Sequence, residues 1–182
     1  RLKCVSECRQ KSPTLSVRHD ADTPMLFTQI RQPAESYLAV PEVSSENRKY
    51  IPIGFLTADI IGSNKLYIIP NASLYMFGIM ISNVHMAWMR TVCGRLKSDY
   101  SYSPAVYNNF PWPAPTELQK VKIEQTAQAI LDARALYPDS SLADLYDELT
   151  MPPELRKAHQ ANDRAVMDAY GFTKGTAART SE

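Results

Sequence analysis

The sequence predicts an α+β fold, with a small mixed sheet and packed helices followed by a helical domain. Three short runs rich in β-branched and aromatic residues lie between residues 37 and 70, and proline or polar residues bound each run. After Pro113 the chain instead shows helix-capping patterns and apolar residues at helical spacing. We therefore expect two domains, residues 1–113 and residues 114–182.

The first domain is expected to open with helices and to continue as a sheet. Residues 1–12 predict a short helix that ends before Pro13. Thr23-Pro24 is typical of a helix start, and this second helix is expected to extend to about residue 30. The three β-rich runs predict a small sheet with strands over residues 37–40, 50–55 and 66–70.

Two further helices, over residues 72–77 and 82–92, are expected to follow the sheet. The second begins at a capping Ser82 and is apolar on two sides, which predicts a helix buried in the core. His85 lies on this helix, so we interpret it as a hydrogen-bonded core residue and not as a catalytic one. Residues 95–109 are polar and rich in Tyr and Ser, and we expect them to be irregular.

The second domain predicts three helices. Residues 116–119 form a capping box that opens a long helix to about residue 137. A short helix is expected to start at Ser140 or Ser141, and Pro152-Pro153 opens a last helix that ends at Gly171-Phe172. Residues 173–182 are polar, and we expect them to fray. The inward-facing residues are expected to be Leu118, Val121, Ala127, Ile130, Leu131, Leu142, Leu145, Tyr146, Leu149, Leu155, His159, Val166 and Tyr170.

The composition indicates a soluble globular chain. Of the 182 residues, 45% are hydrophobic and 21% are charged, which excludes a wholly disordered protein. The most apolar stretch, residues 66–81, is interrupted by Pro70-Asn71 and falls short of the roughly 18–20 residues of a membrane span. Three cysteines are too few for a disulfide framework and suit a reducing, cytoplasmic location. Cys4 and Cys8 lack further ligands nearby, so we expect no metal site.

The charge is divided unevenly between the two predicted domains. Residues 1–113 hold twelve Lys and Arg against eight Asp and Glu, a net charge of +4. Residues 114–182 hold eight against eleven, a net charge of −3. Such asymmetry favours two units with different partners. Because the chain begins at Arg1 without a methionine or a signal segment, we expect a fragment of a longer protein.

The chain carries no recognisable catalytic motif. No glycine-rich loop joins a strand to a helix, as a nucleotide or S-adenosylmethionine site would require, and no phosphate-binding Lys-Ser/Thr motif is present. His159 and Asp163 lie four residues apart on a predicted helix, a spacing that more often stabilises a helix surface than forms a proton relay. We therefore expect no catalytic residues in this chain.

One polar stretch has the chemistry of base recognition. On an extended segment, residues 95, 97 and 99 would project to one side. Lys97 is a donor that suits O6 and N7 of guanine, and Asp99 is an acceptor that suits the amino group of cytosine, so the two could read a G·C pair in the major groove. The alternative is a solvated loop in which Lys97 and Asp99 pair with each other, and the residue types alone favour this alternative.

A second polar cluster, residues 44–49, lies between two of the predicted strands. Its hydroxyl groups and its cations, Arg48 and Lys49, suit a phosphate backbone. A solvated hairpin loop explains these residue types equally well. Together the two clusters supply the residues expected to hold the DNA backbone, which are Ser44, Ser45, Arg48, Lys49, Arg95, Tyr100 and Tyr102.

Long motifs also occur in a fixed order along the chain. They are PEVSSENRKYIPIGF at residues 41–55, LYMFG at 74–78, SNVHMAW at 82–88, CGRLKSDY at 93–100, YNNFPWP at 107–113 and LTMPPELRKAH at 149–159. The first five resemble the target-recognition domain of MmeI-like Type IIG (Type IIL) restriction–modification proteins. The last resembles the helical C-terminal domain of the same family. The resemblance therefore covers nearly the whole chain.

This resemblance implies a parent protein that is a bacterial, S-adenosylmethionine-dependent DNA methyltransferase specific for the N6 atom of adenine. An upstream methyltransferase domain would carry the cofactor, and a fused endonuclease, where present, would use Mg²⁺. The present chain would choose the sequence on double-stranded DNA. In such proteins the side chains that match Lys97 and Asp99 vary with the recognised base, and a Lys/Asp combination is associated with guanine. The resemblance thus favours the base-reading interpretation of this pair.

A different class of function is a protein-interaction module that docks on a methyltransferase without reading bases. The overall net charge of +1 and the long helical C-terminal part are compatible with it. Retention on DNA or heparin at low salt separates the two classes, because a docking module would flow through.

Overall fold

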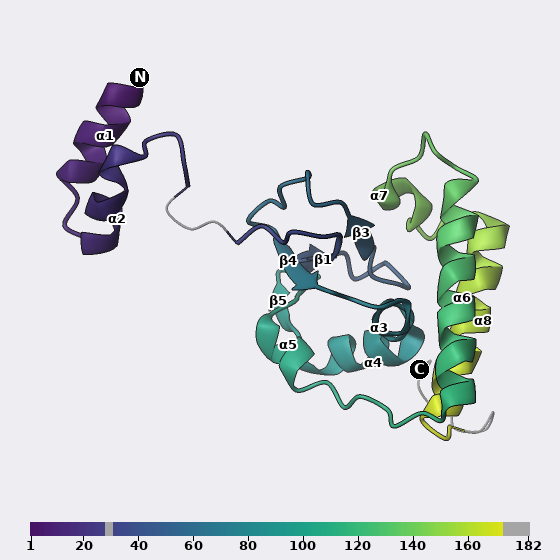
Figure 1. Ribbon diagram of the computed structural model, residues 1–182. Helices are drawn as coiled ribbons and strands as arrows, with labels where there is room; N and C mark the ends of the chain where they lie inside the picture. Colours follow the sequence, from purple (N-terminus) through teal and green to yellow (C-terminus); the bar gives the residue numbers. More distant parts are fainter. Residues whose placement is uncertain (28–30, 173–182) are drawn as a thin grey trace. The chain divides into compact units, whose positions relative to one another are not determined.

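The computed structural model describes residues 1–27 and 31–172 (Figure 1). The chain forms two compact units, Arg1–Pro33 and Ala34–Glu182. The domain boundary predicted near residue 113 stays a prediction, and helices from its two sides pack against each other within the larger unit. Among the described residues, no helix is both long and apolar enough to cross a membrane. The residues expected to fray, 173–182, lie outside the described ranges.

The smaller unit contains α1 (Leu2–Gln10), α2 (Leu15–His19) and a short 3-10 helix (Asp20–Asp22). The first predicted helix is confirmed as α1. The helix predicted from Thr23 is wrong over residues 23–27, which form a turn, and residues 28–30 lie outside the described ranges. The Arg9 guanidinium explains the turn, because it donates hydrogen bonds of 2.6 to 2.8 Å to the carbonyl oxygens of Asp20, Thr23 and Leu26.

The α+β class is confirmed, and the larger unit contains two three-stranded sheets. In the first, β1 (Tyr37–Pro41) lies between β3 (Gly54–Leu56) and β4 (Leu66–Pro70). In the second, β6 (Asp99–Ser101) lies between β2 (Val43–Ser44) and β5 (Gly94–Leu96). The four pairings are antiparallel rather than mixed, and only β5 and β6 are consecutive strands joined by a two-residue loop. The stretch expected to be irregular, residues 95–109, instead forms β5, β6 and the short helix α5 (Pro104–Asn108).

Two helices follow the first sheet, as predicted, and the cap at Ser82 is confirmed, while the cap at Ser73 was not predicted. They are α3 (Leu74–Met80) and α4 (Asn83–Val92), and the Ser73 and Ser82 side chains accept hydrogen bonds from backbone N–H groups in the first turns. The prediction that α4 belongs to the core is confirmed, since Met86 and Met89 are buried together with His85. The His85 ring contacts the Met80 carbonyl oxygen at 2.7 Å and the Tyr102 hydroxyl at 3.1 Å, which confirms its role as a hydrogen-bonded core residue.

The C-terminal part contains α6 (Glu117–Ala135), α7 (Leu142–Leu145) and α8 (Pro153–Ala169), and α6 and α8 run side by side (Figure 1). The predicted capping box opens α6 at Thr116. Of the two predicted starts of the short helix, the structure has Ser141, which opens α7 with a capping box of its own. The end of α8 is also confirmed: Gly171 has φ +71°, and the Phe172 N–H donates to the Met167 carbonyl at 2.9 Å.

Part of the predicted inward face is wrong. Leu118 is 85% exposed, Val121 is also exposed, and Leu149 is 95% exposed. The buried stripe of α6 runs through Ile123, Ala127 and Ile130 instead. Leu118 precedes Ile123 by five residues, which places it about 140° around the helix axis from that stripe. The packing partners α3 and α8, which sequence periodicity does not reveal, select the stripe that is buried.

The helices α3, α6 and α8 meet at Gly78. A Cβ atom at this position would lie 2.7 Å from Cγ2 of Ile123 and 3.1 Å from Cβ of Ala127, so a glycine is needed for this close approach. Asn162 of α8 donates a 2.7 Å hydrogen bond to the Gly78 carbonyl oxygen and accepts one of 3.1 Å from Thr126 of α6. These contacts join elements from both sides of residue 113.

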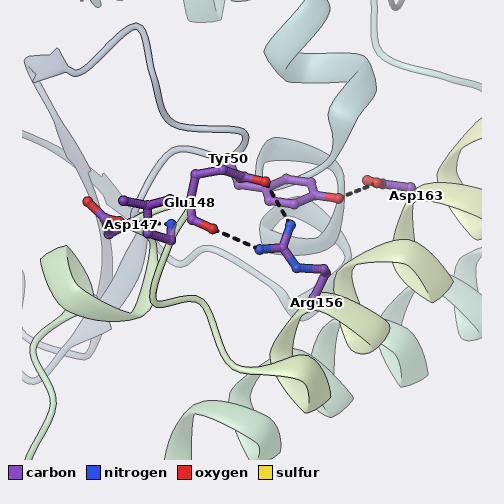
Figure 2. Close-up of polar contacts among 6 residues, drawn as sticks. Tyr50, Asp147, Glu148, Arg156 and Asp163 are labelled. Carbon is purple, nitrogen blue, oxygen red and sulfur yellow. Dashed lines mark hydrogen bonds and ion pairs between the residues drawn. The ribbon is translucent and has the colours of Figure 1, made fainter.

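A second set of buried polar contacts surrounds Asp163 of α8. Its Oδ2 accepts a 2.7 Å hydrogen bond from the Tyr50 hydroxyl (Figure 2). Its Oδ1 accepts one of 2.8 Å from the Asn83 backbone N–H. His159 stacks on the Tyr50 ring at 4.1 Å and contacts the Tyr146 hydroxyl at 2.7 Å. The expected inward position of His159 is confirmed, but its expected pairing with Asp163 at a helix surface is wrong, because both residues are buried and each has other partners. We call Gly78, Asn162, Asp163 and their partners the buried junction.

Candidate nucleic-acid interface

The base-reading candidates lie on a hairpin formed by β5 and β6. Arg95 is paired with Tyr100 and Leu96 with Asp99, so Lys97 and Ser98 form a two-residue loop. Lys97 is exposed and has φ +57°, in the left-handed region that few residues other than glycine adopt. The expected extended segment with residues 95, 97 and 99 on one side is wrong, because the chain reverses between Lys97 and Asp99. The hairpin places the two side chains at its tip.

The second polar cluster lies beside this hairpin. Strand β2 pairs with β6, with Ser44 opposite Tyr100, so the segment after β2 runs past the start of β6. The Glu46 backbone N–H donates a 3.4 Å hydrogen bond to Oδ1 of Asp99, and the Glu46 carboxylate lies 3.8 Å from the Arg95 guanidinium. Two clusters about fifty residues apart in sequence therefore form one surface. Both clusters were predicted from the sequence, but their adjacency was not.

Three of the predicted backbone-binding residues are buried. Ser44 is 2% exposed, Tyr100 6% and Tyr102 3%. The Tyr102 hydroxyl contacts His85, and burial raises the pKa of Tyr102. Ser44 and Tyr100 face each other in the β2–β6 ladder with their side chains toward the protein. Because they are buried, these residues support the hairpin from the protein side, and the prediction that they hold the DNA backbone is wrong for this conformation.

The remaining predicted residues are accessible at the surface. Ser45 and Arg48 are half-buried, and Lys49 is exposed, with its ammonium 6.0 Å from the centre of the Tyr50 ring. Arg95 is exposed, but its guanidinium lies over the Tyr100 ring. The Arg48 N–H donates a 3.2 Å hydrogen bond to the Ser45 carbonyl oxygen, next to Glu46, whereas Lys49 lines a pocket together with Asn83 and Asp163. A cation beside a donor–acceptor pair is the combination that positions a protein on phosphates and reads a base edge.

The comparisons with known proteins decide the family. The family model described as the MmeI target recognition domain matches residues 1–114, and the model described as the MmeI C-terminal domain matches residues 115–181. The chain belongs to the MmeI family. It consists of that family's target recognition domain and C-terminal domain, as the sequence motifs indicated.

Two relatives of the MmeI-type chain agree with this assignment. DNA methyltransferase A of Bacillus subtilis (strain 168) is 42% identical over 171 residues, which are 93% of this chain and 19% of that protein. The structure of the Type IIL restriction-modification enzyme MmeI in complex with DNA superposes with a TM-score of 0.86 and 51% identity, over 98% of this chain and 24% of that one. This chain therefore spans about a fifth to a quarter of the length of these relatives.

The residues of this MmeI-type chain do not fit an S-adenosylmethionine site. In the described ranges, no glycine opens a helix directly after a strand: Gly54 and Gly94 lie in strands, Gly62 in a loop, Gly78 within α3 and Gly171 at the end of α8. The same ranges contain no group of three or more His, Cys, Asp or Glu side chains placed to hold a metal ion.

Proposed function

We propose that this chain selects the DNA sequence on which a longer MmeI-type protein acts, and that Lys97 and Asp99 read one G·C pair in the major groove. The observation that carries the proposal is the hairpin tip, where an exposed donor and a half-buried acceptor stand two residues apart. A two-stranded β ribbon is one of the elements that fits into the major groove.

The polarity of the pair supports guanine and cytosine as its target. The Lys97 ammonium is a donor for O6 and N7 of guanine. Oδ1 of Asp99 accepts the Glu46 N–H, and among the described residues no group donates to its Oδ2. That oxygen is therefore available to the N4 amino group of cytosine, which is the donor of a G·C pair in the major groove.

Arg48, Lys49 and Ser45 would hold the phosphate backbone beside that base pair. Contacts of this type add affinity that does not depend on sequence and that weakens with salt, because each neutralised phosphate releases counterions. The positive electrostatic potential of this surface is modest, since Glu46 lies among the cations. The affinity that does not depend on sequence is therefore expected to be low.

The parent protein is proposed to be an adenine-specific DNA methyltransferase that uses S-adenosylmethionine in a domain upstream of this chain. A duplex positioned by the hairpin would present the target adenine, which must leave the base stack before its amino group is methylated. Where an endonuclease is fused to the same protein, Mg²⁺ would act there. The upstream methyltransferase domain and double-stranded DNA are the proposed partners.

Selection from a pool of randomised duplexes tests the proposal. The full chain is incubated with the pool at low salt, and the retained DNA is sequenced. Enrichment of a short motif that contains a fixed G·C pair is the expected result. Salt-sensitive retention without enrichment would contradict base reading by this chain, and absence of retention would favour the alternative function, a protein-docking module.

A further inference from the structure

We infer that Arg95 and Glu46 are positioning residues, which fix the Lys97/Asp99 pair from within the protein and do not contact phosphate. The inference rests on the proposed function and goes beyond it. It replaces the phosphate contact that the sequence predicts for Arg95. Three sets of contacts on the β5–β6 hairpin carry it.

The Arg95 guanidinium joins the two strands and the loop. Its Cζ atom lies 4.0 Å from the centre of the Tyr100 ring, which is the residue directly opposite on β6. Its Nη1 donates a 2.7 Å hydrogen bond to the carbonyl oxygen of Ser98, inside the loop. Tyr100 is itself part of the hydrophobic core. A continuous path of contacts therefore leads from the core through Tyr100 and Arg95 to the loop.

The loop needs such support because its backbone is unfavourable. Two-residue hairpin loops favour Asn-Gly or Gly-containing pairs, since the left-handed conformation is easy for those residues. Here Lys97 adopts φ +57° without that advantage. The hydrogen bond from Arg95 to Ser98 stabilises the conformation that presents the Lys97 side chain.

Glu46 acts on the other half of the pair. Its backbone N–H donates to Oδ1 of Asp99 at 3.4 Å, which orients the carboxylate, and its own carboxylate lies 3.8 Å from Nη1 of Arg95. Both side chains of the ion pair are more than two-fifths exposed, so the pair contributes little to overall stability. Its effect is local: it links the 45–49 segment to the hairpin and holds Arg95 over Tyr100.

The salt dependence of DNA binding distinguishes a positioning role of Arg95 from a phosphate contact. A side chain that neutralises a phosphate contributes about one unit to the slope of log affinity against log salt. A positioning residue leaves that slope unchanged and alters discrimination between bases. Its guanidinium plane is also essential, because a lysine ammonium cannot both stack on Tyr100 and reach the Ser98 carbonyl.

The test compares Arg95→Met and Arg95→Lys of the full chain on the duplex selected above and on a duplex with the G·C pair replaced by A·T. Both variants are expected to lose about fivefold or more of the preference for G·C. The salt slope on the A·T duplex should stay that of the wild type. Arg48→Met is the matched control, and it should lower the slope by about one while keeping the preference.

Glu46→Gln provides a second, independent readout. It removes the ion pair with Arg95 but keeps the backbone donor to Asp99, so its loss of preference should be smaller than that of Arg95→Met. Because Glu46 is inferred to act partly through Arg95, the double variant should lose no more preference than Arg95→Met alone. Thermal unfolding of each variant confirms that the chain is folded under the binding conditions.

The outcomes separate this inference from the proposed function. A wild-type chain with no preference for G·C would overturn the proposed function and the inference together. If Lys97→Ala loses the preference while Arg95→Met keeps it and lowers the salt slope, only the inference is overturned. Retention of preference in Arg95→Lys with loss in Arg95→Met would likewise show that charge, and not the stacked guanidinium, is what matters.

Discussion

The β5–β6 hairpin and the buried junction each contain an aspartate, and the two aspartates differ in how many hydrogen bonds the protein donates to them. In the junction, both carboxylate oxygens of Asp163 accept hydrogen bonds, at 2.7 and 2.8 Å, from donors on other elements. On the hairpin, Asp99 accepts one longer hydrogen bond of 3.4 Å, and Lys97 is exposed at the loop. A buried polar group whose hydrogen-bond partners come from the protein stabilises the fold. An exposed polar group that can still form hydrogen bonds is available to a ligand.

This difference predicts where substitutions will unfold the chain and where they will change only binding. Removing a buried side chain such as Asp163 leaves its donors without hydrogen bonds, at a cost to stability. Removing an exposed side chain with few partners has little effect on stability. The two regions therefore give separate signals in unfolding and in DNA binding.

Asp163→Ala is expected to cause the largest loss of stability. The Tyr50 hydroxyl and the Asn83 N–H would both lose their acceptor, and each unsatisfied buried group costs roughly 1–3 kcal/mol, so the total is about 2–6 kcal/mol. Urea unfolding followed by circular dichroism measures it. Asp132→Ala is the matched control, because Asp132 accepts a hydrogen bond from the Gln128 side chain in an exposed pair, and a similar loss there would refute the comparison.

Acid is expected to destabilise the chain through His85. Burial lowers the pKa of His85 from 6.5 to about 4, against a smaller opposing effect of the Met80 carbonyl. The folded state therefore favours the neutral ring, and this contribution is complete above pH 6.5 and lost as the pH falls toward 4. A shift of this size corresponds to about 3 kcal/mol.

The measurement is the free energy of unfolding between pH 7.5 and 4.5 for the wild type and His85→Gln. The variant is expected to show a shallower pH dependence. Burial also lowers the pKa of His159, which leaves part of the dependence in the variant. His19, on the smaller unit, is the control position, and an unchanged slope in His85→Gln would contradict the assignment.

Gly78→Ala tests the packing of the junction. The added Cβ would lie within 2.7 Å of Ile123 and 3.1 Å of Ala127, so α3 must shift against α6, and overpacking of this kind costs about 1–3 kcal/mol. Gly94→Ala is the matched control, since its nearest neighbour would be Cβ of Ser101 at 4.0 Å. Equal melting temperatures for the two variants would show that α3 and α6 do not pack this closely.

Arg48→Ala is expected to have the smallest effect on stability, within about 0.5 kcal/mol. It should weaken binding to all duplexes alike and lower the salt slope by about one, because it removes one phosphate contact. Titrations at several salt concentrations measure both quantities. A selective loss on the G·C duplex would instead assign Arg48 to base reading.

Features fixed by local interactions were predictable from the sequence. The caps at Ser82 and Thr116 depend on residues within one turn and are found where the sequence predicts them, and Ser141 is one of the two starts predicted for α7. The three β-rich runs also contribute to one sheet as expected, although the prediction of a strand over residues 50–55 is wrong for residues 50–53, and β3 covers only Gly54–Leu56. These signals involve neighbours along the chain, so one sequence is enough to recognise them.

Features fixed by tertiary contacts were not predictable in this way. The turn at residues 23–27 depends on Arg9, and the buried stripe of α6 depends on α3 and α8. Tyr102 reads as a surface residue in a polar stretch, yet the pairing of β6 with β2 and the contact with His85 place it in the core. The adjacency of Glu46 and Asp99 has the same origin.

The most direct test of base reading by the hairpin compares the wild type and Lys97→Ala on two duplexes that differ only at the selected G·C pair. The wild type is expected to prefer G·C over A·T by an amount equivalent to about 1–3 kcal/mol. Lys97→Ala should abolish that preference while its binding to the A·T duplex stays close to that of the wild type. An equal loss of affinity on both duplexes, with the preference intact, would contradict the account.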